Sequence, residues 1–311
     1  MSSLTQVKNT LKRNELITCS YEIIENKFRT LLYNISPVLL AKYRYIIKMG
    51  RLPNFGTPKS FDEKLLWLML YWRHPLKTQC ADKYAVRRYV EEHGLGYMLP
   101  ELLGVYEKSI EINYDSFPER FVLKCTHGCG YNIICEDKKL LDREEVKRKI
   151  DKWIRIDISK LGGEVHYASI KPMIICESFL DDSSGNLPSD YKVYCFDGMA
   201  YCTMACTERG SGTTKFDFYD REWKKKLPYS QQSALAGRNI QKPEAYEEII
   251  EAAERLSKPF PFVRMDFYSI NGKAVMGEMT FTPNGCIDPG LTDIAQQELG
   301  AMIILPHKYP K

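Results

Sequence analysis

Two acidic side chains near the end of the sequence have the types and spacing that could hold a cation. The segment 263–281 contains two apolar-rich stretches joined by Asn271-Gly272, a dipeptide typical of a hairpin turn. Asp266 lies in the first stretch and Glu278 in the second, each on the polar face of its predicted strand. Two carboxylates close together on one face are costly unless a cation lies between them. The hairpin is therefore a candidate cation site.

The register of this hairpin decides whether the two carboxylates meet. A two-residue turn at Asn271-Gly272 would place Asp266 opposite Gly277, whereas a loop that also includes Lys273 would place it opposite Glu278. We expect the longer loop, because it buries one apolar face and leaves both carboxylates on the other. The apolar face would then carry Val263, Met265, Phe267, Val275, Gly277, Met279 and Phe281, and the carboxylate face would carry Arg264, Tyr268, Met276 and Thr280.

Composition describes a folded globular chain that needs neither a nucleic-acid nor a membrane partner. The 311 residues are 44% hydrophobic and 27% charged, which excludes a disordered chain, and the formal net charge is only +4. The longest apolar run, 65–72, falls well short of the ~20 residues of a membrane-spanning helix, and the first residues contain no secretory core. We therefore expect a cytoplasmic protein without an integral membrane segment.

The ten cysteines form no CxxC pair, which favours free thiols in a reducing compartment. Cys125, His127, Cys129 and Cys135 are zinc-capable residue types that lie close together in the sequence. Their spacing lacks the paired short loops of structural zinc sites, so we expect no zinc there.

The periodicity and turn residues predict the elements that position these side chains. We expect helices within 28–33, 38–47, 60–72, 82–90, 142–158 and 244–256, and strands at 121–124, 133–136, 173–180, 190–196 and 199–206. Ser60 and Glu63 have the spacing of a capping box, and Pro75 is expected to end the helix that follows. We divide the chain into a helical extension (1–59), a helical or substrate subdomain (60–120), a small subdomain (121–185) and a large subdomain (186–311).

A glycine-containing loop follows the strand that ends at Lys124. The loop, 125–132, includes Gly128 and Gly130, so its backbone can approach a phosphate closely and offer N–H donors. It lacks the GxxxxGK[ST] of a P-loop and the GxGxxG of a dinucleotide-binding fold. Considered alone, such a loop is more often a plain hairpin turn.

Several sequence blocks taken together resemble a known family. The blocks are FDEKL at 61–65, CADKY at 80–84, FVLKCTHG at 121–128, DYKVYCF at 190–196 and GEMTFTP at 277–283. They resemble the teichuronopeptide-biosynthesis (TupA-like) family of the ATP-grasp fold, over roughly residues 60–305. The resemblance implies an α+β protein in which two α+β subdomains enclose ATP, preceded by the helical extension.

The resemblance also implies roles for particular residues. Lys83 and Lys124 would reach the phosphates of ATP, and the loop with His127, Gly128 and Gly130 would cover them. The strand segment 175–178 would hold the adenine edge through its backbone, with Asp181 or Asp182 at the ribose; this assigns Cys176, Glu177 and Leu180 to the nucleotide. Asp266 and Glu278 would hold Mg²⁺. Thr280 stands where many ATP-grasp enzymes have Asn, so its place in the metal site is open.

Five side chains also have plainer interpretations. Lys83 and Arg87, four residues apart, could form a solvated helix face, and Glu177 could be a surface carboxylate at a strand end. Arg209 could be merely exposed or could bind the transferred phosphoryl group. Arg264 could form a structural ion pair with Asp266 or Glu278, or contact the γ-phosphate of ATP.

The leading functional hypothesis is an ATP-dependent carboxylate–amine ligase that works through an acyl phosphate. Lys192, Arg209 and Arg264 would neutralise the developing charge, with ATP and Mg²⁺ as cofactors. The resemblance suggests that an amino acid is joined to a uronic acid in a bacterial surface-polysaccharide (capsule) pathway, with peripheral membrane association through residues 1–59 as one option. The alternatives are an ATP-grasp kinase acting on a sugar hydroxyl and a non-catalytic nucleotide-binding partner of a glycan assembly complex.

Overall fold

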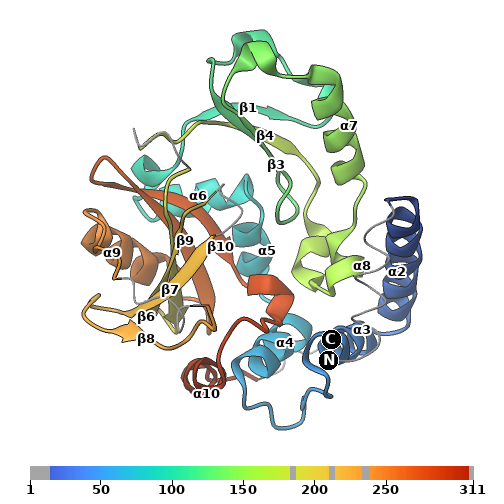
Figure 1. The fold of residues 1–311 in the computed structure, drawn as a ribbon, viewed down its shortest axis with the longest axis vertical. Helices are drawn as coiled ribbons and strands as arrows, with labels where there is room; N and C mark the ends of the chain where they lie inside the picture. The colour runs from blue at the N-terminus through green and yellow to red at the C-terminus, as the bar shows by residue number, and fades with distance from the viewer. Residues whose placement is uncertain (1–14, 183–186, 210–213, 233–238, 308–311) are drawn as a thin grey trace.

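Two antiparallel sheets form the frame of the molecule (Figure 1). The computed structural model describes residues 15–182, 187–209, 214–232 and 239–307. The small sheet has the strand order β1 (Leu102–Tyr106), β4 (Ile174–Ser178), β2 (Phe121–Cys125), β3 (Asn132–Cys135). The large sheet has the order β10 (Lys273–Thr280), β9 (Val263–Ile270), β5 (Asp190–Phe196), β6 (Met199–Thr207), β7 (Lys215–Asp220), β8 (Lys226–Leu227).

Helices join and cover these sheets. The longer ones are α2 (Glu15–Ile35), α3 (Pro37–Met49), α4 (Phe61–Tyr71), α5 (Pro75–Ala81), α6 (Ala85–Glu92), α7 (Arg143–Ile154), α8 (Ile158–Gly162), α9 (Tyr246–Ser257) and α10 (Asp293–Met302). Short 3-10 turns include η1 (Gly96–Met98), η2 (Ser109–Glu111), η3 (Tyr114–Ser116), η4 (Lys138–Leu140), η5 (Val165–Ser169) and η7 (Pro283–Cys286). Helices α2 and α3 form the predicted extension, and α2 lies beside α8 (Figure 1). Within the described residues, none of the helices has the length and apolar character needed to span a bilayer.

Each sheet has its own hydrophobic core. The large core joins the buried face of the large sheet to α4, α5, α6, α9 and α10, and Phe61 packs edge-on against Phe262 with ring centroids 5.2 Å apart. The small core lies between the small sheet and α7, around Phe117 and Phe121. The segment 60–120 divides between the two, because α4–α6 contribute to the large core whereas β1 is a strand of the small sheet.

Local signals set several element boundaries. The predicted capping box is present: Ser60 accepts from the Glu63 N–H at 3.3 Å, and the Glu63 carboxylate accepts from the Ser60 N–H at 3.3 Å. The expectation that Pro75 ends this helix was wrong. The helix ends at Tyr71, and Pro75 occupies the first turn of α5, where its missing N–H costs no hydrogen bond. The predicted helix over 142–158 is interrupted after Ile154, and α8 starts anew with Asp157 as its N-cap.

Candidate functional site

The hairpin of β9 and β10 does place Asp266 opposite Glu278, but not through a longer loop. Ile270 pairs with Lys273, so the turn contains only Asn271 and Gly272, both with positive φ (50° and 75°), as a type I′ turn requires. A β-bulge at Gly277 then shifts the register by one residue between Met276 and Glu278. The expected facing pair was therefore right, and the expected loop was wrong.

The bulge also changes which side chains of β10 enter the core. Val263, Met265 and Phe267 are buried in the core, as expected for the first strand. On β10, Met276 belongs to the core, 1% exposed, although the sequence pattern placed it on the carboxylate face. An extra residue at Gly277 reverses the alternation, so Met276 before the bulge and Met279 after it lie on the same side.

Asp266 is held on both oxygens by cationic side chains. Arg264 donates from Nε to Oδ1 and from Nη2 to Oδ2, both at 2.7 Å, and the Lys192 ammonium lies 2.5 Å from Oδ2. Lys192 also contacts Asp190 at 2.5 Å, and burial raises the pKa of that carboxyl. The side chains of Arg264 and Asp266 are 9% and 4% exposed. The ion-pair interpretation of Arg264 thus describes this structure, and Lys192 completes the cluster.

Glu278 is the open carboxylate of the pair, with its side chain 32% exposed. Thr280 donates to Oε1 at 3.0 Å, Lys83 lies 3.7 Å from Oε2, and Arg264 lies 3.9 Å from Oε1. Burial alone would raise the pKa of Glu278, but the charges of Lys83, Lys192 and Arg264 outweigh it and lower the pKa to about 2. The carboxylate is therefore ionised and available to a ligand.

These residues fit a magnesium ion that a bound polyphosphate would complete. Among the described residues, no group of three or more His, Cys, Asp or Glu side chains forms a metal cage by itself. Two facing carboxylates and a threonine hydroxyl are hard oxygen ligands, which suit Mg²⁺ when phosphate oxygens supply the remaining positions. Both Asp266 oxygens already accept from cations, so Glu278 is the more accessible ligand.

Lys83 connects this pair to the glycine loop. It precedes α6, and its backbone N–H donates to Thr126 O at 3.3 Å while its ammonium donates to Gly128 O at 2.5 Å. Gly128 has no room for a side chain, since a Cβ would come within 2.7 Å of the Tyr131 ring. The loop tip is thus fixed beside Glu278 through one lysine, and Lys83 is not part of a solvated helix face.

His127 is directed into the protein. The ring is 4% exposed, its Nε2 lies 3.1 Å from Trp153 O, and its centroid lies 5.8 Å from that of the Tyr131 ring, tilted by 42°. Burial lowers its pKa, so the imidazole is neutral at pH 7. In this arrangement the imidazole anchors the base of the loop.

A pocket at the junction of the two sheets gathers several of the residues assigned to the nucleotide. Lys124, Glu177 and Leu180 line it, and Arg209 and Tyr268 close it from the large sheet. The Lys124 ammonium lies 2.6 Å from Glu177, and Arg87 contacts the same carboxylate at 3.1 Å. Glu177 is buried by this double ion pair, so the surface-carboxylate interpretation was wrong. The pair holds Lys124 in the pocket wall.

The backbone of β4 is less available than the sequence suggested. β4 lies between β1 and β2, Cys176 pairs with Gly104 and Leu123, and the Ser178 N–H donates to Glu101 O at 2.9 Å. The Cys176 side chain is buried in the small core. Phe179 and Leu180, which directly follow β4, line the pocket. Asp181 forms an ion pair with Arg120.

Arg209 lines the same pocket at the junction of the two sheets. Its guanidinium donates to Pro188 O at 2.9 Å and lies 5.6 Å from the centre of the Tyr268 ring. Residues 210–213 of the expected Gly-Ser-Gly loop lie outside the described residues. Arg209 is therefore separated along the sheet from the Arg264–Asp266 pair by Tyr268.

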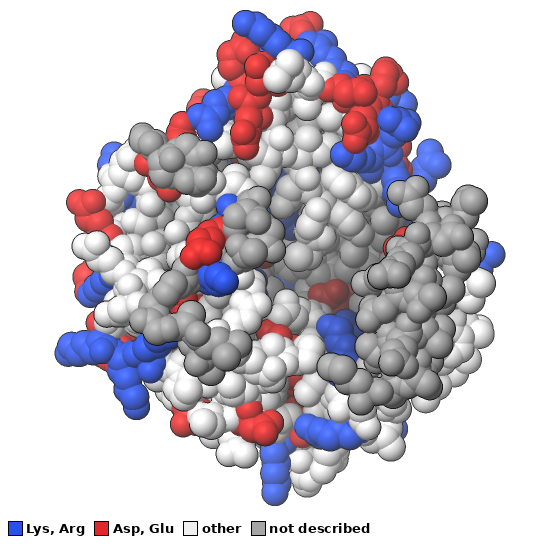
Figure 2. All heavy atoms as spheres, in the orientation of Figure 1, with Lys and Arg blue, Asp and Glu red and all other residues white. Residues whose placement is uncertain are grey.

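A second pocket lies on the same face of the large sheet, at the other end of the acidic pair. Lys192, Tyr194 and Arg264 form its wall on β5 and β9, and Asn284 and Asp288 of the segment after β10 form another part. Because Lys192 and Arg264 also hold Asp266, this pocket adjoins the carboxylates directly. Figure 2 shows the surface hollowed near the middle of the molecule, below the small sheet.

Three residues of this arrangement were not assigned to the site from sequence. Asp190 lies two residues before Lys192, so strand alternation places both side chains on one face of β5. This alternation could have assigned Asp190 to the site from the sequence. Tyr268 shares the face of Asp266 for the same reason. Arg87 was noted beside Lys83, but its contact with Glu177 joins residues 90 positions apart and had no local signal.

The fold and the site have the features of the ATP-grasp class: two antiparallel sheets, with a glycine loop on the small sheet and a paired-carboxylate hairpin in the large sheet, linked through Lys83. The model of the TupA-like ATP-grasp family matches residues 63–304, and the chain belongs to that family. Membership supports ATP-dependent ligation in general. No curated protein matches the chain.

Solved structures that are similar in fold are distant in sequence. D-alanine–D-alanine ligase from Bacillus anthracis complexed with ATP has 13% identity and a TM-score of 0.45, covering 79% of this chain and 68% of that chain. The ATP-grasp ligase PsnB, complexed with Mg and ADP, has 13% identity and a TM-score of 0.42, with coverages of 74% and 60%. Phosphoribosylamine–glycine ligase from Thermotoga maritima has 14% identity and a TM-score of 0.42, with coverages of 66% and 48%.

Proposed function

We propose that this protein is an ATP-dependent carboxylate–amine ligase that forms an amide through an acyl phosphate. The observation that carries the proposal is the order of features along one face of β5 and β9. Cross-strand pairing aligns Asp190 with Tyr268, then Lys192 with Asp266, then Tyr194 with Arg264. The pocket with Lys124 lies at the Tyr268 end, the acidic pair in the middle, and the second pocket at the Arg264 end.

That order matches the order of groups in the reaction. The nucleoside and the first phosphates of ATP would occupy the pocket that Lys124, Leu180 and Arg209 line, with Phe179 and Leu180 offering backbone groups to the base. The γ-phosphate would then lie beside Asp266 and Glu278. The carboxylate substrate would occupy the second pocket, in reach of the γ-phosphorus.

Magnesium, held by Glu278, Asp266 and the phosphates with Thr280 as a further oxygen, would neutralise phosphate charge. The protein's own cations do the remaining work. Lys83 fixes the loop through Gly128 and also faces Glu278, so loop closure and metal binding are coupled. Lys192 and Arg264 present positive charge to the substrate carboxylate and to the oxygens of the transferred phosphoryl group.

The chemical steps need no nucleophilic side chain. A carboxylate oxygen attacks the γ-phosphorus of ATP, ADP leaves, and an acyl phosphate forms. The amine then attacks the acyl carbon, the carbon–oxygen bond to phosphate breaks, and an amide, inorganic phosphate and a proton are released. Positioning and charge neutralisation supply the rate enhancement.

For the substrates, we propose a uronic acid carboxylate and an amino acid amine, in assembly of a bacterial surface polysaccharide. Support comes from the family and from the second pocket, where two cations adjoin the polar side chains of Ser230 and Asn284, a combination suited to an acidic sugar. The described cysteines are free thiols, consistent with a cytoplasmic protein that uses ATP.

The decisive experiment follows an oxygen atom. A uronic acid with heavy oxygen in its carboxylate is incubated with ATP, Mg²⁺ and a panel of amino acids, and inorganic phosphate is examined by phosphorus NMR. An acyl-phosphate ligase transfers one labelled oxygen to phosphate. Unlabelled phosphate together with amide would exclude the acyl phosphate, and a stable phosphorylated sugar would establish a kinase instead.

A further inference from the structure

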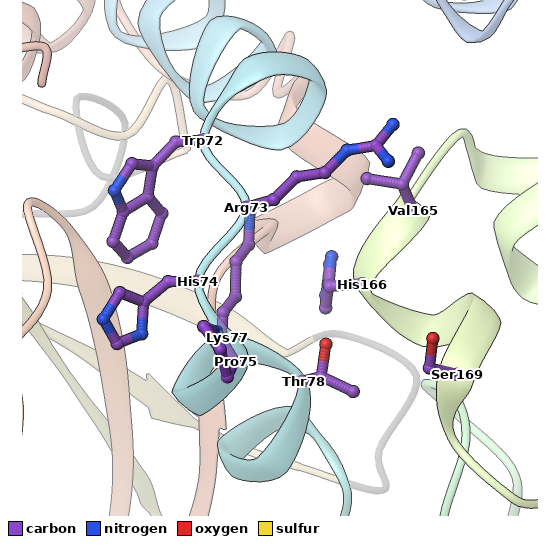
Figure 3. A pocket seen from close by; sticks show the side chains of 9 residues that line it. All are labelled: Trp72, Arg73, His74, Pro75, Lys77, Thr78, Val165, His166 and Ser169. Carbon is purple, nitrogen blue, oxygen red and sulfur yellow. The ribbon is translucent and has the colours of Figure 1, made fainter. Parts of the chain in front are cut away.

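A separate pocket lies between α5 and η5 (Figure 3). It shares no lining residue with the pocket at the junction of the two sheets. Its wall on the α5 side includes Trp72, Arg73, Lys77 and Thr78, and its wall on the η5 side includes His166 and Ser169. None of the residues assigned to ATP or to the metal lines it. The pocket combines cationic, hydroxyl and aromatic groups, and no Asp or Glu of the described chain is in its lining.

His166 is the most unusual group in this pocket. It is 7% exposed, and within the described residues neither ring nitrogen has a hydrogen-bond partner. In Figure 3 the imidazole lies opposite Thr78, on the side of the pocket that η5 forms. Buried polar atoms are rarely left unsatisfied, and a ligand in the pocket with both an acceptor and a donor would satisfy both ring nitrogens.

Lys77 supplies a buried positive charge next to His166. Its side chain is 2% exposed, its ammonium donates to Leu68 O at 3.2 Å, and it lies 5.7 Å from the centre of the Trp72 ring. Burial lowers its pKa to about 8, so it remains mainly protonated at neutral pH. Burial, and then the charge of Lys77, keep the pKa of His166 well below its usual value.

Glu164 is the carboxylate that interacts electrostatically with Lys77, and it does not line the pocket. One of its oxygens accepts from Thr282 at 2.5 Å. Arg73 is exposed at the pocket and adds a second positive charge. The pocket is thus cationic at its base and at its opening, with one neutral imidazole able both to donate and to accept.

We propose that this pocket binds an oxyanion, the phosphate or carboxylate group of a small molecule. Lys77 and Arg73 would provide the charge, and His166, Thr78 and Ser169 would provide hydrogen bonds to the oxygens. The site is connected to the hairpin: the His166 ring lies 6.2 Å from that of Phe281, which follows Thr280, and Tyr167 interacts electrostatically with Glu278. The pocket is therefore linked to the end of the hairpin through Phe281.

The test measures anion binding with the nucleotide pocket blocked. Inorganic phosphate and D-glucuronate are titrated separately, by calorimetry, into protein saturated with Mg–ADP, and the imidazole resonances are followed by NMR. We expect at least one anion to bind at millimolar concentration and to shift the His166 resonances. Glucuronate held only in the pocket with Lys192 and Arg264 would leave these resonances unshifted. A His166 shift with phosphate alone identifies a phosphoryl group as the ligand, and a shift with glucuronate alone identifies a carboxylate.

Variants locate the site. His166→Phe and Lys77→Met remove the buried donors and are expected to abolish binding. Arg73→Gln changes an exposed residue, so this variant is expected to fold even if the two buried variants do not. Loss of the Arg73 charge should weaken anion binding about tenfold. Arg88→Gln, which removes an equal charge on the surface of α6, is the matched control. Equal affinity in Arg73→Gln and Arg88→Gln, or no binding by the unaltered protein, would overturn the proposal. The ligase proposal does not depend on either result.

Discussion

Replacement of Gly277 by alanine tests whether the bulge sets the geometry of the acidic pair. The bulge brings Glu278 opposite Asp266, and a Cβ at Gly277 would lie 3.1 Å from Asp266 O and 3.2 Å from the Tyr268 ring. Gly277 does not have a positive φ, so alanine is compatible with its backbone dihedral. The effect of the substitution therefore arises from contact with the neighbouring strand.

Two opposing contributions determine its size. Replacing glycine by alanine at a compatible dihedral stabilises a protein by about 0.4–1 kcal/mol, because the unfolded chain loses freedom. Overpacking against a fixed neighbour costs about 1–3 kcal/mol, and Asp266 O is a backbone atom in the centre of a sheet, so it cannot move aside cheaply. We expect a net loss of about 1 kcal/mol. A displacement of Asp266 by a few tenths of an ångström should lower turnover by about tenfold.

Urea unfolding gives the free-energy change, and two assays at a temperature where both proteins are folded give the functional change: ATP turnover and the affinity for Mg–ADP by calorimetry. Gly56→Ala is the matched control, because its Cβ would meet only Asn54 Oδ1 at 3.6 Å. If Gly277→Ala kept full stability and full turnover, the bulge would not be what positions the two carboxylates.

Three further predictions concern individual carboxylates. Glu278→Gln should abolish ATP turnover while changing the free energy of unfolding by less than about 1 kcal/mol, because its side chain is partly exposed; normal turnover would remove it from the metal site. Glu177→Gln leaves Lys124 and Arg87 partly buried without their shared partner, so the free energy of unfolding in urea should fall by about 2–3 kcal/mol. An unchanged free energy would mean that water already screens the two ion pairs. Burial raises the pKa of Asp62 from 3.8 to about 7, so the folded protein binds this proton more tightly than the unfolded chain does. Stability relative to Asp62→Asn should therefore fall as pH rises from 3.8 to about 7, and a parallel pH profile of the two proteins would contradict this.

Features with local causes were predictable from the sequence. The capping box at Ser60, the strands around Asp197-Gly198 and the hairpin after Lys124 depend on residues a few positions apart, and all are present in the structure. The Asp266–Glu278 pairing was predicted from the same kind of pattern. The bulge was not, because a glycine in a strand signals several conformations, and only contact with Asp266 O selects one of them.

Features that depend on distant contacts were not predictable. No local pattern indicated that β1 would join the small sheet, since its neighbour β4 lies about seventy residues further along the chain. The contact between Arg87 and Glu177 follows from that sheet, because the pairing of β4 with β1 and β2 fixes where Glu177 lies. The pocket with His166 and Lys77 likewise forms only when α5 and η5 pack together.

The charge of the site itself implies a polyanionic ligand. Five cations contact four carboxylates around the two adjoining pockets: Lys83, Arg87, Lys124, Lys192 and Arg264, with Glu177, Asp190, Asp266 and Glu278. Arg209 lines the first pocket and Asp288 lines the second. Among these described residues, six cations minus five carboxylates leaves one positive charge in a partly buried region. A triphosphate with its magnesium remains an anion and would neutralise that excess, whereas a neutral sugar would not. Lys192 lies between Asp190 and Asp266, and Asp266 also pairs with Arg264, so arrival of a phosphate can draw Lys192 from Asp266 without leaving that carboxylate unpaired. The ion pairs at the site therefore hold its cations in place until the nucleotide replaces part of their interactions.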